Sequence, residues 1–173
     1  MIEVTPDTWI ISDTHFGHKN IVKYCNRPMH HNSLMIAQWH KRVAPEDVVL
    51  HFGDLAVWYG PEKDEWLEKA AELPGKKYML RGNHDLLKDK MFAKYGFTII
   101  PEFIQEMEYK RNLKRVLFSH YPDVDRIGSW DVNIHGHIHN NDLDPKLAAT
   151  NRRYINVSIE MMDYKPTKLK DIL

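Results

Sequence analysis

The sequence contains a single cysteine, Cys25, so no disulfide bond can form within the chain. No apolar run approaches the roughly 20 residues of a membrane-spanning helix. The first residues lack the basic start and apolar stretch of a secretory signal. Neither sign of charge is in excess, because 24 Lys and Arg residues balance 24 Asp and Glu residues. These absences predict a cytoplasmic protein with no membrane partner and no strong overall attraction to nucleic acid.

The composition is otherwise that of an ordinary globular protein, apart from its histidines. The chain has 173 residues, of which 43% are hydrophobic, and we expect residues 1–173 to form a single domain. Eleven residues are histidine. Many histidines beside one cysteine suit metal binding through nitrogen and oxygen ligands better than a structural zinc–thiolate site.

The pattern of apolar runs and breakers predicts alternating strands and helices, followed by a strand-rich half. A helix is expected from about Leu34 to Val43 with Asn32 or Ser33 as its cap, and Lys110-Arg111-Asn112 is expected to form a hairpin turn. Expected strands are 9–11, 48–52, 77–80, 97–100, 103–109, 115–119, 132–135 and 154–158, and further helices lie between Gly60 and Pro74 and at 86–95. This order predicts two packed sheets with helices outside them.

Five short polar segments each follow an expected strand. They are Asp13-Thr14-His15, Gly53-Asp54, Gly82-Asn83-His84-Asp85, Ser119-His120 and Gly136-His137-Ile138-His139. Residues two apart in an extended chain point the same way, so we expect the side chains of Asp13 and His15, and those of His137 and His139, to converge. The glycines permit sharp turns. Because ligand sites gather at the carboxyl ends of strands, the segments predict a shared site.

Taken in this order, the five segments resemble the signature of the calcineurin-like metallophosphoesterase superfamily, in particular its small single-domain prokaryotic and phage-type members. The resemblance spans residues 9–139. It implies an α/β fold, the four-layer α/β/β/α sandwich of that family, with two divalent metal ions at one edge between the sheets. It also implies two ligand sets, with Asp54 bridging them: Asp13, His15, Asp54 and His139 for one ion, and Asp54, Asn83, His120 and His137 for the other.

The resemblance implies hydrolysis of a phosphomonoester or phosphodiester, with a slight preference for the diester, by a hydroxide that bridges the two ions. His84 would protonate the leaving oxygen, and Asp85 would orient His84. Arg81, His18 and Arg27 are candidate substrate contacts. Manganese is the first choice of metal in vitro, although iron, zinc or nickel also suit such ligands.

Several simpler interpretations stand beside these. Asn83 alone could supply a left-handed turn, and Arg27 could form a structural salt bridge. Trp58, Tyr59 and Tyr121 could stack on a substrate ring, but we favour packing for them. Two other functions compete with a small phosphate-ester substrate: a nuclease acting on DNA or RNA, which the neutral charge does not favour, and a non-catalytic scaffold that kept the fold.

Overall fold

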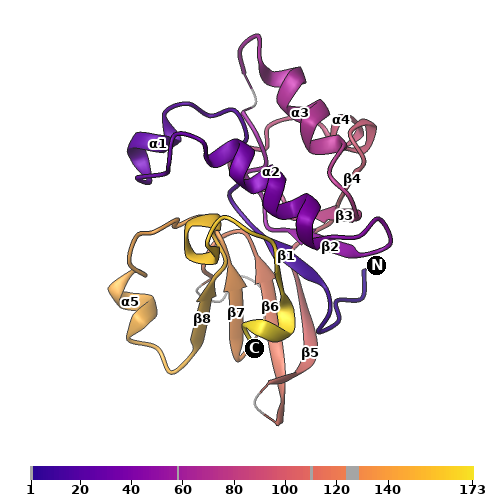
Figure 1. Cartoon of the computed structure of the whole chain (residues 1–173). Coiled ribbons are helices and arrows are strands. Elements are labelled where there is room, and N and C mark those ends of the chain that lie inside the picture. Colours follow the sequence, from indigo (N-terminus) through magenta and orange to yellow (C-terminus); the bar gives the residue numbers. More distant parts are fainter. Residues whose placement is uncertain (1, 58, 110, 124–128) are drawn as a thin grey trace.

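Two stacked β-sheets form the centre of the protein, with helices α2, α3 and α4 covering the first sheet (Figure 1). The computed structural model describes residues 2–57, 59–109, 111–123 and 129–173. Trp58, expected to pack, and Lys110, expected in a hairpin turn, lie outside the described residues. The expected sandwich is confirmed, although the only helix on the side of the second sheet in the described part of the chain is α5, beside β8.

The first sheet has the strand order β4-β3-β2-β1-β9. Strands β1 to β4 are parallel, and β9 pairs antiparallel with β1. Their bounds are Trp9–Ile11 for β1, Val48–His51 for β2, Lys76–Met79 for β3, Phe97–Ile99 for β4 and Thr167–Lys168 for β9. The carboxyl ends of β1, β2 and β3 therefore lie side by side at one edge, where the polar segments that follow these strands can form a shared site.

The second sheet has the strand order β5-β6-β7-β8, with β5 and β6 antiparallel and the other pairs parallel. Its strands are β5 Phe103–Tyr109, β6 Asn112–Ser119, β7 Val132–His135 and β8 Arg153–Asn156. Tyr109 pairs directly with Asn112, so β5 and β6 form the expected hairpin, with Arg111 in a left-handed conformation (φ 65°). The carboxyl ends of β6 and β7 face those of the first sheet, because His120 after β6 bonds to Phe52 after β2 and His137 after β7 bonds to Asp13 after β1.

The helices are α1 Ile21–Tyr24, α2 His31–Arg42, α3 Lys63–Ala71, α4 Asp89–Lys94 and α5 Pro145–Ala148, with 3₁₀ turns at Ile159–Met162 and Leu169–Asp171. The capping prediction for α2 is wrong, because the helix begins at His31. Asn32 accepts a hydrogen bond from the main-chain N–H of Gly17 (3.3 Å), and Ser33 donates to the carbonyl of His30 (2.9 Å). Both side chains are therefore used elsewhere.

Successive residues of the central strands pack into different cores. Ile10 and Leu50 face the second sheet, whereas their neighbours Ile11 and Val49 face the helices. All four are fully buried. A sheet covered on both faces needs apolar residues at every position rather than at alternate ones, which is why these strands are continuous apolar runs in the sequence.

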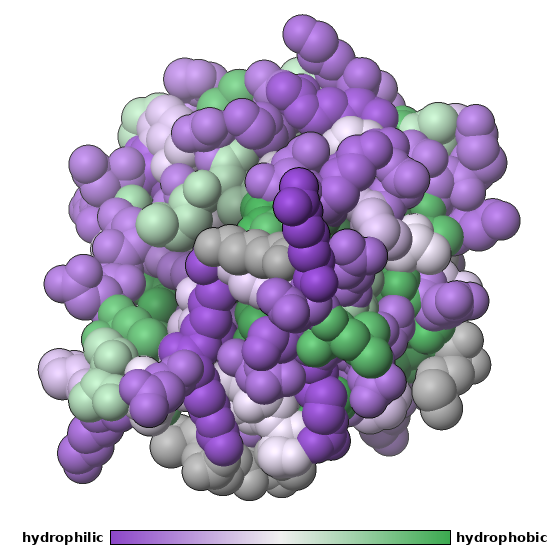
Figure 2. Space-filling view, turned by 90° about the horizontal axis from the view of Figure 1, so that it is seen from below, coloured by the Kyte–Doolittle hydropathy of each residue, from purple (hydrophilic) through white to green (hydrophobic). Residues whose placement is uncertain are grey.

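The surface offers no extended apolar area on the face that Figure 2 shows, where hydrophobic residues form small scattered patches among hydrophilic ones. None of the helices in the described ranges is long and apolar enough to cross a lipid bilayer.

A substitution at Trp39 on α2 provides a test of the packing between the helices and the first sheet. It is fully buried, and its indole N–H donates to the carbonyl of Pro74 (2.9 Å). We expect Trp39→Ala to lower the free energy of unfolding by about 3–5 kcal/mol through the cavity and the lost hydrogen bond. His40→Ala, an exposed position on the same helix, should change it by less than about 0.5 kcal/mol. Urea denaturation of both variants measures this, and equal midpoints would contradict the packing described.

Candidate metal centre

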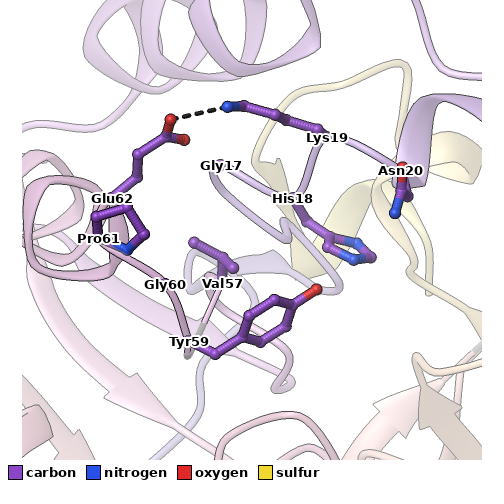
Figure 3. A pocket seen from close by; sticks show the side chains of 9 residues that line it. All are labelled: Gly17, His18, Lys19, Asn20, Val57, Tyr59, Gly60, Pro61 and Glu62. Atoms are coloured by element: carbon purple, nitrogen blue, oxygen red, sulfur yellow. Dashed lines mark hydrogen bonds and ion pairs between the residues drawn. The ribbon is translucent and has the colours of Figure 1, made fainter.

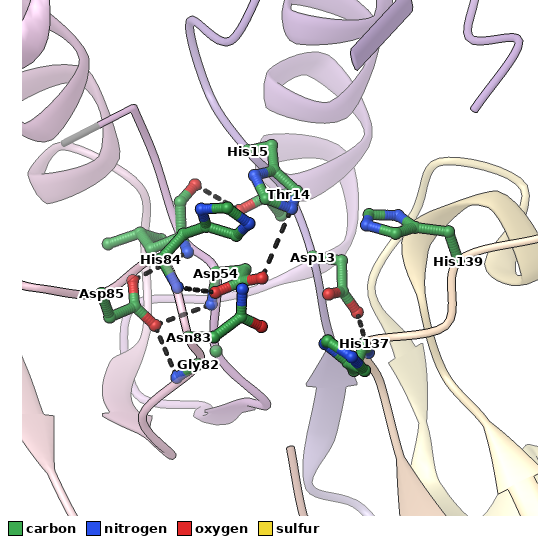
Figure 4. A network of polar contacts seen from close by, with 12 residues as sticks. Asp13, Thr14, His15, Asp54, Gly82, Asn83, His84, Asp85, His137 and His139 are labelled. Atoms are coloured by element: carbon green, nitrogen blue, oxygen red, sulfur yellow. Dashed lines mark hydrogen bonds and ion pairs between the residues drawn. The ribbon is translucent and has the colours of Figure 1, made fainter. Parts of the chain in front are cut away.

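The polar segments of both sheets meet at one edge of the molecule (Figure 4). Main-chain hydrogen bonds join the segments that follow β1 and β2. The N–H of Asp13 donates to the Gly53 carbonyl and the N–H of His15 to the Asp54 carbonyl, both at 3.0 Å. The main-chain N–H of His137 donates to Asp13 Oδ2 (2.9 Å), which ties the second sheet to the first. Main-chain N–H groups therefore assemble the site, and the contact between the two sheets joins residues 124 positions apart.

The candidate ligands converge through an unusual backbone rather than through an extended one. Of the non-glycine residues with positive φ in the described part of the chain, five belong to the predicted ligand set: Asp13 (54°), His15 (46°), Asp54 (56°), His137 (70°) and His139 (53°). The expectation that strand pleating aligns these side chains is wrong, because β1 and β7 end before them. A left-handed conformation costs such residues on the order of 1–3 kcal/mol each, and this strain is typical of functional sites.

The glycines act in two ways. Gly53 adopts a left-handed turn (φ 101°), as expected. Gly82 and Gly136 are needed for close approach instead: a Cβ atom on Gly82 would lie 2.2 Å from Asp54 Oδ1, and one on Gly136 would lie 2.0 Å from Ser12 Oγ. A side chain at either position would displace the neighbouring ligand segment.

The ligand atoms form two groups, in each of which they lie within 4.8 Å of one another. The first group contains Asp13, His15 and His139, and the second contains Asp54, His120 and His137. Asn83 adjoins the second group, because its Oδ1 lies 3.1 Å from His120 Nε2. Asn83 is not among the left-handed residues, so the simple turn interpretation does not hold.

Asp54 lies between the two groups. Its Oδ1 accepts a hydrogen bond from the main-chain N–H of His84 (2.8 Å). Its Oδ2 lies 3.5 Å from His15 Nε2 and 3.6 Å from His120 Nε2, one imidazole from each side. These distances exceed those of ordinary N–H···O hydrogen bonds, but they suit atoms that share a cation about 2.1 Å from each.

Several acceptor atoms in the site have no hydrogen-bond partner. His15 Nε2 and Asp13 Oδ1 are buried and unpaired, although buried polar atoms are normally satisfied. The Nδ1 of His120 lies 2.7 Å from the carbonyl oxygen of Phe52, so it carries the proton and leaves the Nε2 lone pair facing Asn83 Oδ1. Converging nitrogen and oxygen acceptors fit a divalent cation.

Most charges of the site point the same way, although hydrogen bonds to Cys25 and Glu160 raise the pKa of His139 to about 10 against the effect of burial. Burial raises the pKa of Asp54 to about 6, and Asp13 and Asp85 add to the shift while His120 opposes it. Burial lowers the pKa of His137 to about 4, with His120 contributing, and burial lowers the pKa of His15 well below its usual value. These two imidazoles are therefore neutral at pH 7, which is the form that binds metals. A cation would offset the cost of the buried Asp54 carboxylate.

His84 lies at the rim of this site. Its side chain is exposed, and its ring packs edge-on against that of His15, with 5.3 Å between centroids. The geometry argues against the prediction that Asp85 orients His84. The buried Asp85 carboxylate accepts hydrogen bonds from the main-chain N–H groups of Asp54 (2.7 Å), Gly82 (2.8 Å) and Leu55 (3.1 Å). Asp85 therefore holds two ligand loops together rather than acting on His84 (Figure 4).

The geometry argues against two of the three expected substrate contacts. The buried Arg27 guanidinium donates to the carbonyls of Asp13 (2.6 Å) and Thr14 (2.8 Å) and to Glu160 (2.7 Å). Arg27 therefore forms a structural salt bridge, which was the alternative interpretation of this residue.

Arg81 has a similar structural part in the loop that carries His84. Its guanidinium donates to the carbonyls of Asp85 and Leu87 and pairs with Asp89. His18, by contrast, lines a small pocket with His15 and His84 and remains a candidate contact.

Tyr59 and Tyr121, for which stacking on a substrate ring was the alternative to packing, differ in their surroundings. The Tyr121 ring packs on those of His137 (centroids 4.2 Å apart) and His120 (4.9 Å). Packing is therefore the better description of Tyr121. Tyr59 is 53% exposed and lines a pocket beside the site, so the packing we favoured does not describe it.

Sequence reasoning missed Glu160 and Cys25. Glu160 Oε1 lies 3.0 Å from His139 Nδ1 and also pairs with Arg27, and Cys25 lies in the same cluster. Ser158, which donates to Asp13 Oδ2 (3.0 Å), was missed as well. A signal for Ser158 and Glu160 was available, because Ser158 ends the last expected strand and Glu160 comes two residues later, much as the five recognised segments stand at the ends of theirs.

Comparisons with known proteins agree with this geometry. An uncharacterised protein of Methanocaldococcus jannaschii is 37% identical over 175 residues, which cover 93% of this chain and 86% of that protein. The gene 66 protein of Mycobacterium phage L5 is 26% identical over 183 residues, which cover 89% of this chain and 86% of that protein. The crystal structure of a protein of unknown function from Aquifex aeolicus matches with a TM-score of 0.73 at 34% identity, covering 95% of this chain and 96% of its own.

The model of the calcineurin-like phosphoesterase family matches residues 7–166, a range that contains every candidate ligand. The ligand set itself, with its nitrogen and oxygen donors, fits the divalent metal ions on which that family depends. The chain therefore belongs to the calcineurin-like phosphoesterases, a family of metal-dependent phosphoester hydrolases.

Proposed function

We propose that this protein hydrolyses small phosphate esters with two divalent metal ions held on either side of Asp54. The observation that carries the proposal is the place of Asp54 Oδ2, 3.5 Å from His15 Nε2 and 3.6 Å from His120 Nε2. A single carboxylate that faces both ligand groups supports two neighbouring cations, whose mutual repulsion it offsets. The remaining ligands in the proposal are Asp13, His15 and His139 for one ion, and Asn83, His120 and His137 for the other.

When bound, two such cations lower the pKa of a water molecule and offset the negative charge of the phosphoryl oxygens. The protein's own contribution to proton transfer is His84. Its main chain is fixed by the hydrogen bond to Asp54 Oδ1, whereas its imidazole is exposed at the rim. His84 is thus placed to give a proton to the leaving oxygen of an ester held at the centre. Manganese is the metal we would supply first, because carboxylate, amide and imidazole ligands suit it.

The entrance to the site is open at His84 and Asn83, both of which are exposed. A phosphodiester as well as a phosphomonoester can approach from this side, and we propose a slight preference for the diester. Bis-p-nitrophenyl phosphate and p-nitrophenyl phosphate are therefore the first substrates to test.

We expect His84→Ala and Asp54→Ala to fail in different ways. His84→Ala should keep both metal ions and lose turnover by a factor on the order of 10²–10⁴, because only the proton donor is removed. Asp54→Ala should lose both ions, because the carboxylate between the groups is gone. Steady-state kinetics with manganese, together with metal content by plasma mass spectrometry, separates the two effects.

Two results would count against this assignment. Loss of metal from His84→Ala would make that residue a ligand rather than a proton donor. If the manganese-loaded wild type left both nitrophenyl esters intact, the catalytic proposal itself would fail. Lys94→Ala, a change on the last turn of α4, serves as the control and should leave both activity and metal content unchanged.

In the same proposal, Glu160 positions the imidazole of His139. Because a carboxylate only accepts hydrogen bonds, His139 Nδ1 at 3.0 Å from Glu160 carries the proton. Hydrogen bonds to Cys25 and Glu160 raise the pKa of His139 to about 10, so a metal ion would bind Nε2 in place of its proton. Arg27, with side-chain exposure of 0%, contacts the same Oε1 atom of Glu160 as His139 does, at 2.7 Å. Partners of this kind set the tautomer and orientation of metal-binding histidines.

We expect Glu160→Gln to weaken binding at the Asp13, His15 and His139 group by about 10–100-fold, while the other group keeps its ion. The amide oxygen of glutamine can still accept from both Arg27 and His139, which contact Glu160 Oε1, so the variant removes only the negative charge behind His139. Calorimetric titration of metal-free protein with manganese measures the two affinities. Glu65→Gln, which removes an exposed carboxylate paired with Lys69, is the matched control. Equal losses at both sites would contradict a role through His139.

A further inference from the structure

A second cluster of metal-binding side chains lies beside the candidate metal centre. It consists of Cys25, His139 and Glu160, whose ligand atoms, one from each residue, lie within 4.8 Å of one another. Cys25 directly follows α1, and Glu160 belongs to the 3₁₀ turn Ile159–Met162. Cys25 and Glu160 are outside the two ligand groups proposed for catalysis. The cluster is therefore a separate set of donors that shares only His139 with the centre.

The Glu160 carboxylate has one oxygen that is used and one that is not. Its Oε1 lies 2.7 Å from Arg27 Nε and 3.0 Å from His139 Nδ1. Its Oε2 is buried and has no hydrogen-bond partner among the described residues, and the side chain is only 5% exposed. An unsatisfied buried oxygen costs about 1–3 kcal/mol, so such atoms normally have a partner. Oε2 is therefore available to a cation.

Glu62 shows the contrast. It lines a pocket of about 330 Å³ together with Gly17, His18 and Lys19 (Figure 3). Its Oε1 accepts a hydrogen bond from Lys19 Nζ at 2.8 Å, and its side chain is 43% exposed. Cys25, the only cysteine of the chain, does not line this pocket. Glu62 is thus a carboxylate that has a partner and lacks the thiol.

The donors of the cluster select a different metal from those of the catalytic groups. Cysteine sulfur, histidine nitrogen and glutamate oxygen are all ligands of zinc, which binds them at about 2.0–2.3 Å and commonly takes water in its fourth position. A thiolate is a soft ligand and favours zinc over manganese. The catalytic groups contain only nitrogen and oxygen donors. Cys25 therefore gives the cluster its preference for zinc.

The segment that carries Cys25 can open to admit an ion. Cys25 is 5% exposed, but α1 before it has only four residues and no side-chain hydrogen bond at its N-cap. Tyr24, the last residue of α1, is 72% exposed. A single turn of helix with few buried side chains opens at little cost.

We propose that Cys25, His139 and Glu160 bind a zinc ion that inhibits the hydrolase. The zinc site is independent of the proposed function, whereas the inhibition rests on it. On binding, Cys25 Sγ and His139 Nδ1 bond to zinc, and their protons pass to solvent. His139 would then carry one cation on Nδ1 and another on Nε2. Because the two cations repel each other, zinc weakens the ion held with Asp13 and His15, and that ion weakens zinc by the same factor.

Cobalt(II), which accepts the ligands of zinc and is coloured, tests the site without any chemical step. A cobalt–thiolate bond gives a charge-transfer absorption band in the near ultraviolet. Because Cys25 is the only cysteine, the band reports on this residue alone. We expect the reduced, full-length protein to develop the band as cobalt is added. Zinc should abolish the band, and an equal concentration of manganese should leave it.

Four variants locate the bound ion. Cys25→Ser should give no band. Glu160→Gln should weaken the cobalt binding that the band reports by about 10–100-fold, whereas the control Glu62→Gln should leave it unchanged. Asp54→Ala removes the carboxylate between the catalytic groups and should keep the band. His15→Ala provides the same measurement if Asp54→Ala does not fold.

Zinc inhibition is measured on the manganese-loaded protein with bis-p-nitrophenyl phosphate. We expect zinc to inhibit the wild type. Cys25→Ser should need at least about 10-fold more zinc for the same fractional inhibition, because losing a direct ligand costs no less than losing a partner behind one. Equal zinc sensitivity of the two proteins would overturn the inhibition, since zinc would then act by replacing manganese in the catalytic groups.

The remaining outcomes separate the zinc site from the function. If no thiolate band forms, or if it disappears in both Asp54→Ala and His15→Ala, the separate site is overturned even where the nitrophenyl ester is hydrolysed. A band that zinc abolishes, in a protein whose manganese-loaded form hydrolyses no ester, would support the zinc site and overturn the hydrolase proposal.

Discussion

The carboxylate of Asp54 is the constraint on which the rest of the site depends. It is buried, its Oδ2 faces an imidazole nitrogen on each side, and burial together with Asp13 and Asp85 raises its pKa to about 6. Gathering so many acceptors in a place that excludes water is costly unless a positive charge joins them. The ligand arrangement is therefore more easily understood as a cradle for cations than as a self-sufficient network.

Holding that arrangement requires support from outside the ligand set. Five candidate ligands have a left-handed backbone, which persists only where the surroundings over-determine it. The Asp85 carboxylate supplies part of this support, because it takes the N–H groups of two ligand loops. Arg27 supplies another part, because it fixes the carbonyls of the Asp13 loop and the carboxylate behind His139. Charged residues that resemble catalytic groups in the sequence thus serve to position the ligands.

The sequence predicted the parts of the fold and site that depend on local pattern. The apolar runs before Asp13, Asp54 and Asn83 predicted strands that end at these residues, and the structure confirms them as β1, β2 and β3. The partners of Arg27 and Asp85 could not be predicted from the sequence. Glu160 lies 133 residues from Arg27, and the N–H of Asp54 that Asp85 accepts from is a main-chain group of another loop. The left-handed ligand backbone was also missed, because residue spacing does not report φ. The metal ligands, the ions and the role of His84 remain proposals that the geometry supports.

Anomalous diffraction from crystals of the manganese-loaded protein tests the central claim most directly. The account predicts two peaks, one on each side of Asp54 Oδ2, the first within bonding distance of Asp13, His15 and His139 and the second of Asn83, His120 and His137. A single peak that Asp54 does not touch, or manganese bound only elsewhere on the molecule, would contradict it.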